Sequence, residues 1–232
     1  GKRLKAMILA AGLGTRMRPL TDNTPKPMLA VAGKPLIQHH VEKLVASGIN
    51  EIIINHAYLG EQIEGHLGDG SKFNAAICYS RETEPLETGG GIFKALPFFA
   101  GDSFLVVNGD IWCDIEYQSL PEQLVGLAHL VMVRNPAHNP DGDFMLDVNS
   151  DSVLENAEQV DQIEGKSCFT YSGLSLLSPR LFERCELGKF PLAPLMRSAM
   201  KQRQVSGQLF EGYWLDVGTP ARLDLLEEHL QL

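Results

Sequence analysis

Two short segments of this 232-residue chain combine residue types that bind phosphate groups. The first reads Gly12-Leu13-Gly14-Thr15-Arg16, and the second holds Lys26 between two prolines. Glycines let backbone N–H groups approach an anion, while a guanidinium and a positioned ammonium supply positive charge. Because Met17 stands where a dinucleotide-binding loop needs glycine, and no segment matches the Walker pattern, we predict a different kind of triphosphate loop. Taken alone, the Gly-x-Gly pattern also fits a plain tight turn.

Two aspartates far apart in the chain are candidate ligands of one divalent cation. Asp110 follows the apolar run 104–107 and a turn glycine, and Asp216 ends the stretch Tyr213-Trp214-Leu215. Mg²⁺ prefers oxygen ligands and is usually held by one or two carboxylates together with phosphate oxygens. We therefore predict that Asp110 and Asp216 share one Mg²⁺, although either alone would also suit a turn or the start of a helix.

The elements that must position these residues alternate between strand and helix. Apolar and β-branched runs predict strands at 6–11, 51–55, 76–80 and 104–108, with helices at 36–47, 59–67 and 92–96 between them. The second half is less regular, with strands expected at 128–134, 144–148 and 169–177 and helices at 179–184, 192–202 and 221–231. Repeated strand–helix units predict a parallel sheet with helices on both faces. Ligands of such sheets bind at the carboxyl ends of the strands, so chemistry is expected in the loops after Ala11, Ser80 and Asn108.

Composition excludes several classes of function. The formal net charge is −9 and no basic block stands out, which argues against a nucleic acid or an anionic membrane as the main partner. No apolar run approaches the roughly 20 residues of a membrane span, so we expect a cytoplasmic protein. The 4 cysteines are scattered and the 7 histidines form no pair at metal spacing, so neither zinc nor a disulfide framework is expected.

The Gly12–Arg16 segment together with Thr24-Pro25-Lys26-Pro27 resembles the two-part signature of sugar-1-phosphate nucleotidylyltransferases, G-x-G-T/S-R followed by P-K. The resemblance covers nearly the whole chain. It implies a Rossmann-like three-layer α/β fold with a mixed, mostly parallel sheet and helices on both faces. It also implies a single domain over residues 1–232, in which 1–115 bind the nucleotide and 116–232 bind the sugar phosphate.

The resemblance also assigns roles to residues. Arg16, Lys26 and Asp110 are expected to be catalytic, with Asp110 and Asp216 on the metal. A bare backbone of glycines after Thr88 is expected to lie against the base. The residues expected to bind the nucleotide are Ala11, Gly12, Gly14, Thr15, Arg16, Lys26, Thr88, Gly89, Gly90 and Asn108.

The sugar pocket departs from the family pattern. The residues expected to line it are Asn108, Gly142, Asp143, Glu158 and Gly173. Many relatives carry Glu-Lys-Pro before the segment of Gly173, whereas this chain reads Leu154-Glu155-Asn156-Ala157-Glu158. The sugar phosphate is therefore expected to depend more on Lys26, and either Glu155 or Glu158 is left to face the sugar.

The resemblance implies an enzyme that transfers a nucleotidyl group from a nucleoside triphosphate to a sugar 1-phosphate, with Mg²⁺ as cofactor and pyrophosphate as by-product. Leu86–Gly91, Asn108–Trp112 and Ile54–Leu59 are most similar to the branch that uses UTP and N-acetylmuramate α-1-phosphate in cell-wall recycling. The alternatives are a dTTP-, GTP- or CTP-dependent enzyme for glucose or mannose 1-phosphate, or a non-catalytic nucleotide-sugar regulator. A monomer or small homo-oligomer is expected. Hexapeptide repeats are absent, so no added acetyl transfer is expected.

Overall fold

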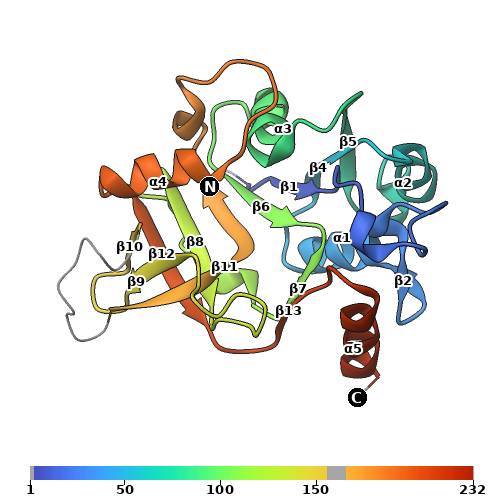
Figure 1. Cartoon of the computed structure of the whole chain (residues 1–232). Helices are drawn as coiled ribbons and strands as arrows, with labels where there is room; N and C mark the ends of the chain where they lie inside the picture. Colours follow the sequence, from blue (N-terminus) through green and yellow to red (C-terminus); the bar gives the residue numbers. More distant parts are fainter. Residues whose placement is uncertain (1–2, 156–165, 232) are drawn as a thin grey trace.

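A mixed sheet runs through the middle of the molecule, with helices packed on both of its faces (Figure 1). The computed structural model describes residues 3–155 and 166–231, and in these residues the sheet has nine strands in the order β5-β4-β1-β6-β11-β8-β12-β10-β9. In chain order the strands are β1 (Ala6–Leu9), β4 (Glu51–His56), β5 (Ala76–Arg81), β6 (Phe104–Asn108), β8 (Ala128–Val133), β9 (Phe144–Asp147), β10 (Ser152–Leu154), β11 (Lys166–Leu177) and β12 (Val205–Phe210). The expected α/β class and mixed sheet are confirmed.

The four strands from the first half of the chain pair in parallel. β1 lies between β4 and β6, and its last residue, Leu9, pairs with Asn55 on one side and Asn108 on the other. The apolar residues of β4 and β6, and those of β1 before Leu9, are buried because helices cover both faces, as continuous apolar runs predict. In the edge strand β5, Ile77 is buried while Ala76 and Cys78 are exposed. The shared register brings the ends of three strands to one edge of the sheet, where ligands of open α/β sheets bind.

The second half of the sheet is mainly antiparallel. β11 pairs antiparallel with β6, β8 and β9, while β8 and β12 pair in parallel. The three strands expected in this half are present, but β10 and β12 were not predicted from the sequence. β12 carries Ser206, Gly207 and Gln208, so its pattern lacks the apolar run that marks the other strands. A Cβ on Gly207 would lie 2.6 Å from the Val153 side chain, so β12 needs this glycine to pack beside β10.

Five α-helices occur in residues 3–155 and 166–231: α1 (Leu36–Ala46), α2 (Gly60–Leu67), α3 (Glu87–Ala95), α4 (Ala193–Lys201) and α5 (Pro220–Leu230). α1 and α2 pack on one face of the sheet, and α3 and α4 pack on the other. Two expectations were wrong in detail. The helix expected at 92–96 begins five residues earlier, at Glu87, and the segment expected as a helix at 179–184 is a 3₁₀ turn, Pro179–Phe182.

Two small ladders complete the structure. β2 (Ala30–Val31) pairs with β3 (Lys34–Pro35), and β7 (Ile111–Cys113) pairs antiparallel with β13 (Trp214–Asp216). α5 follows β13 and packs through Leu226 on Val31 and Leu36. Across the part of the chain that the structure describes, no helix combines the length and apolar character that a membrane crossing requires.

Candidate active site

A cavity of about 430 Å³ opens at the carboxyl ends of β1, β4 and β6. The loops predicted to carry the chemistry, after β1, β5 and β6, form its wall together with Asn55 at the end of β4. Nine of the predicted site residues line it: Ala11, Gly12, Gly14, Thr15, Arg16, Lys26, Thr88, Asn108 and Asp110. This first cavity is within the usual size range of small-molecule sites.

The glycine loop follows β1 and lines the cavity. Gly14 adopts φ +67°, which favours glycine, and its carbonyl accepts a hydrogen bond of 2.6 Å from the Thr21 hydroxyl. Met17 is buried and anchors the 3₁₀ turn Thr15–Met17 that follows. Around Gly12, by contrast, a Cβ would meet nothing within 4 Å. The loop is therefore fixed at Gly14 and open at Gly12, where it faces the cavity.

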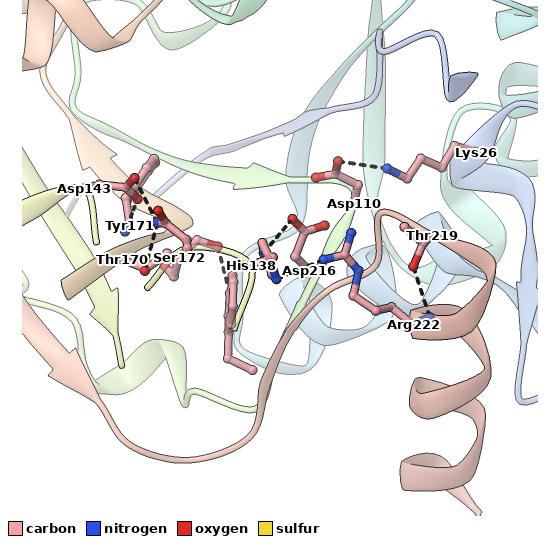
Figure 2. A network of polar contacts seen from close by, with 12 residues as sticks. Lys26, Asp110, His138, Asp143, Thr170, Tyr171, Ser172, Asp216, Thr219 and Arg222 are labelled. Carbon is pink, nitrogen blue, oxygen red and sulfur yellow. Dashed lines mark hydrogen bonds and ion pairs between the residues drawn. The ribbon is translucent and has the colours of Figure 1, made fainter. Parts of the chain in front are cut away.

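Lys26 and Asp110 form an ion pair in the wall of the first cavity. Nζ of Lys26 lies 3.0 Å from Oδ2 of Asp110, and the lysine side chain is only 12% exposed (Figure 2). Pro25 and Pro27 flank the lysine, and the turn Lys26–Met28 fixes its backbone. The fold thus places a cation from the glycine-loop region directly against a carboxylate from the end of β6.

The two predicted metal ligands are brought together by the ladder of β7 and β13. Asp216 pairs with Ile111, and the amide of Val217 donates a 2.8 Å hydrogen bond to the carbonyl of Asp110. Figure 2 shows the two carboxylates beside each other, with Asp216 below Asp110. Oδ1 of Asp216 is buried and has no hydrogen-bond partner among the described residues, while Oδ2 lies 3.6 Å from Nε2 of His138. A buried carboxylate oxygen without a partner is costly, so this position suits a cation.

Two arginines lie close to Asp216. A Cβ on Gly218 would lie 2.8 Å from Oδ1 of Asp216, 2.8 Å from Nη2 of Arg222 and 3.0 Å from Nη2 of Arg16. Arg222 belongs to α5, whose first turn is capped by the Thr219 hydroxyl, and its Nη1 lies 3.0 Å from Nδ1 of His138. Glycine at position 218 therefore leaves the space in which two guanidinium groups approach the carboxylate.

The turn that presents Asp110 rests on a buried histidine. Nε2 of His40 in α1 lies 3.2 Å from the carbonyl oxygen of Gly109. Burial lowers the pKa of His40 from 6.5 to about 4, so the ring is neutral at pH 7 and its N–H can donate to that carbonyl. A Cβ on Gly109 would lie 2.5 Å from the carbonyl of Leu9, so only glycine allows this turn to pack so closely on β1.

A buried polar pair in the first cavity was missed from the sequence. Oδ1 of Asn55 accepts a 2.8 Å hydrogen bond from the amide of Ala10, and its Nδ2 donates to Oε2 of Glu82 at 2.9 Å. Oε1 of Glu82 accepts from the amide of Leu86, so the pair ties the glycine loop to the loop before α3. Asn55 belongs to the end of β4 and Glu82 follows β5, positions at which the edge rule for parallel sheets gives a signal.

The three glycines of α3 do not form a bare surface for a base. Gly89 and Gly90 are buried inside the helix and do not line the cavity, whereas Thr88 and Glu87 do. A Cβ on Gly89 would lie 2.6 Å from the Phe190 ring, and one on Gly90 would lie 2.2 Å from the Gly188 carbonyl. The glycines therefore allow the segment before α4 to pack on α3, which also brings Lys189 to the first cavity.

A second cavity, of about 510 Å³, adjoins the first and shares Leu9, Glu87, Thr88 and Asn108 with it. Asp143 and Gly173, two of the residues predicted for a sugar pocket, line it. Asp143 accepts hydrogen bonds from the Tyr171 amide at 2.8 Å and from Asn139 at 3.1 Å. Gly173 has φ +91°, and a Cβ there would lie 2.9 Å from Cβ of Asn108, so glycine is required where β11 passes β6.

Three other residues expected at the sugar pocket lie elsewhere or are not described. Gly142 does not line the second cavity; its φ of +72° serves the turn before Asp143. Glu155 does not line it either, and pairs with Lys201 at 3.8 Å. Glu158 lies outside the described residues. Arg197 of α4 does line the second cavity and was not predicted, because nothing in its local sequence distinguishes it from a surface arginine.

Comparison with known proteins also indicates a nucleotidyl transferase. A family model described as "Nucleotidyl transferase" matches residues 5–231. An N-acetylmuramate alpha-1-phosphate uridylyltransferase of Neisseria meningitidis serogroup B is 51% identical over 229 residues, covering 95% of each chain. A mannose-1-phosphate guanylyltransferase catalytic subunit beta of Drosophila pseudoobscura pseudoobscura is 30% identical, and the match covers 95% of this chain but 60% of that protein.

A solved structure shares the fold. It is the crystal structure of a putative glucose-1-phosphate thymidylyltransferase from Bacillus anthracis, which superposes with a TM-score of 0.82 at 21% identity and covers 97% of this chain and 94% of that one.

Proposed function

The chain belongs to the nucleotidyl transferase family and is a sugar-1-phosphate nucleotidylyltransferase, and on that premise we propose that it transfers a uridylyl group from UTP to N-acetylmuramate α-1-phosphate. The observation that carries the proposal is the pair of adjoining cavities. One is bounded by the glycine loop, Lys26 and Asp110, and the other opens from it at Asn108. Identity of 51% along both chains supports the named substrates.

We assign the nucleotide to the first cavity and residues 1–115, and the sugar to the second cavity and residues 116–232. The amides of Gly12 and Gly14 and the side chains of Thr15, Arg16 and Lys26 would hold the triphosphate. Ala11, Thr88 and Asn108 stand where the base and ribose would lie. Gly89 and Gly90 would contribute only by letting α3 pack closely behind Thr88.

The residues present fit a divalent cation. Asp110 lies in the turn just before β7, and Asp216 ends β13, which pairs with β7. Asp216 carries a buried oxygen without a described hydrogen-bond partner. No group of three or more His, Cys, Asp or Glu side chains in the described ranges could hold a metal by itself, which is compatible with Mg²⁺ held by two carboxylates and phosphate oxygens. Mg²⁺, when bound, would supply positive charge to the triphosphate oxygens.

The protein's own residues would orient two anions for one displacement. An oxygen of the sugar 1-phosphate forms a bond to the α-phosphorus of UTP, the bond from that phosphorus to the bridging β-phosphate oxygen breaks, and pyrophosphate leaves. Because both reactants are negatively charged, Arg16 and Lys26 would offset their repulsion, and the loop amides would fix the alignment. Lys26 would exchange its contact with Asp110 for one with phosphate.

We place the reaction in the cytoplasm, where UTP is made, and propose that it returns a cell-wall sugar to its nucleotide-activated form. Pyrophosphate release measured over a matrix of four nucleoside triphosphates and several sugar 1-phosphates tests the proposal. The highest kcat/KM is expected for UTP with N-acetylmuramate α-1-phosphate. Preference for dTTP, GTP or CTP with glucose or mannose 1-phosphate would show that the proposed substrates are wrong. No turnover with any pair would indicate a nucleotide-sugar regulator.

A further inference from the structure

The second cavity has one basic side chain among its lining residues, Arg197. Arg197 belongs to α4, whose buried residues Met196, Ala199 and Met200 pack on the sheet. Its guanidinium carbon lies 5.9 Å from the centre of the Phe144 ring, a cation–π distance. The packing of α4 and the contact with the Phe144 ring thus hold the positive charge of Arg197 at the wall of the cavity.

Arg197 makes no ion pair with any residue in the described ranges, whereas Lys201, one turn further along the same helix, pairs with Glu155 at 3.8 Å. Lys201 does not line either cavity. The two cations of α4 therefore differ in a way that matters for binding. Lys201 is paired with a carboxylate of the protein, whereas Arg197 lines a cavity and has no carboxylate partner among residues 3–155 and 166–231.

The charge on Arg197 is separate from the charges that face the triphosphate. Arg16 and Lys26 line only the first cavity, and Arg197 and Phe144 line only the second. The cavities meet at Asn108 and Thr88. A sugar 1-phosphate whose phosphate reaches Lys26 would therefore have its ring in the second cavity, and Arg197 would face a group on that ring, not the reacting phosphate.

We infer that Arg197 determines specificity by binding a carboxylate carried by the sugar. The inference rests on the proposed function, because N-acetylmuramate is N-acetylglucosamine extended by a lactyl ether that ends in a carboxylate. Arginine binds carboxylates through paired, charge-assisted hydrogen bonds. Leu192 and Met196 form an apolar wall beside it, which suits the methyl groups of the lactyl and acetyl substituents.

The acidic residues of the cavity make a cation necessary. Asp143 and Glu87 also line it, and both would repel a carboxylated sugar while accepting hydrogen bonds from the hydroxyls of a neutral one. Without Arg197 the cavity would favour a neutral amino sugar. With Arg197 the balance is reversed in favour of an acidic one.

The test compares kcat/KM for N-acetylmuramate α-1-phosphate and N-acetylglucosamine α-1-phosphate, which differ only in the lactyl group, at saturating UTP. Wild type is expected to prefer the acidic sugar. In Arg197→Ala the preference is expected to fall about 10- to 100-fold, as when a charged hydrogen-bonding partner is removed. Arg197→Lys keeps the charge but not the paired hydrogen-bond geometry, so its preference for the acidic sugar should lie between those of wild type and Arg197→Ala. Lys201→Ala removes a charge from the same helix outside both cavities and should keep the wild-type preference.

Equal losses for both sugars in Arg197→Ala would overturn the inference, because Arg197 would then serve the phosphate or the packing of α4. An unchanged preference would overturn it as well. A wild-type enzyme that turns over the neutral sugar phosphate better than the acidic one would contradict the proposed function itself, before any variant is measured. Failure of the inference and failure of the proposed function are therefore distinguished by the wild-type ratio.

Discussion

The two cavities that meet at Asn108 are built in different ways. The first is formed mainly by loops that follow parallel strands, and three of its charged residues, Arg16, Lys26 and Asp110, lie in short sequence motifs. The second is formed by strand ends, a turn and a helix from both halves of the chain, including Asp143, Gly173 and Arg197. Local motifs therefore form the proposed nucleotide site, whereas packing between distant segments forms the proposed sugar pocket. Substitutions in the first should reduce turnover with every sugar, and substitutions in the second should change which sugar is used.

The largest effect is expected at Asp110. Asp110→Asn removes a charge that contacts Lys26 and would face the proposed cation, so kcat should fall by about 10³-fold with every sugar phosphate. Circular dichroism should show a folded variant, because the backbone contacts of Asp110 remain. Asp114→Asn, close in the chain but outside both cavities, serves as the matched control and should turn over like wild type. Full activity of Asp110→Asn in Mg²⁺ would refute the role of Asp110.

Lys26→Ala comes next in size. The Lys26 side chain is 12% exposed and its Nζ lies 3.0 Å from Oδ2 of Asp110. Its removal should lower kcat by about 10²-fold and raise KM for the sugar phosphate. Lys34→Ala, a lysine of the following hairpin that pairs with Glu42, controls for the loss of charge. Steady-state kinetics with unchanged kcat and KM would exclude Lys26 from the reaction.

His40, which contacts the carbonyl of Gly109 beside the first cavity, should make stability depend on pH. His40 has a pKa of about 4 in the folded protein against 6.5 when unfolded, so the unfolded chain binds its proton first as the pH falls. The stability that neutral His40 provides is complete above pH 6.5 and is lost progressively towards pH 4, by about 3 kcal/mol in total. Urea unfolding at pH 7 and pH 4.5 should therefore show a smaller pH-dependent loss for His40→Gln than for wild type. Equal losses in the two proteins would mean that His40 does not contribute.

A smaller and more selective effect is expected at Gly173. Alanine at φ +91°, with its Cβ 2.9 Å from Asn108, should cost about 1–3 kcal/mol and should raise KM for the sugar phosphate more than KM for UTP. Gly12→Ala is the matched comparison, since a Cβ at Gly12 would meet nothing within 4 Å, and it should leave the unfolding free energy near that of wild type. If Gly173→Ala affects both substrates equally, the two cavities are not separable as described.

The first cavity could be predicted from the sequence more fully than the second. The glycine loop, Lys26 and Asp110 lie in local motifs, and the parallel strands are continuous apolar runs, so these were predictable. The approach of Asp216 to Asp110 followed from a family resemblance and depends on the ladder of β7 and β13, two short strands without a signal of their own.

The parts that could not be predicted depend on contacts between distant segments. Gly89 and Gly90 resembled a bare binding surface, but their space is filled by Phe190 and Gly188. β12 has too few apolar residues to be recognised, although its pairing with β8 stabilises the second half of the sheet. Arg197 acquires its role only because the fold places α4 beside Phe144, which no local pattern specifies.

Binding of Mn²⁺, followed by electron paramagnetic resonance in the presence of UTP, tests most directly whether two distant carboxylates share one cation. The account predicts one tightly bound Mn²⁺ per wild-type chain, with affinity weakened at least about tenfold in both Asp110→Asn and Asp216→Asn. Wild-type affinity in either variant would contradict it.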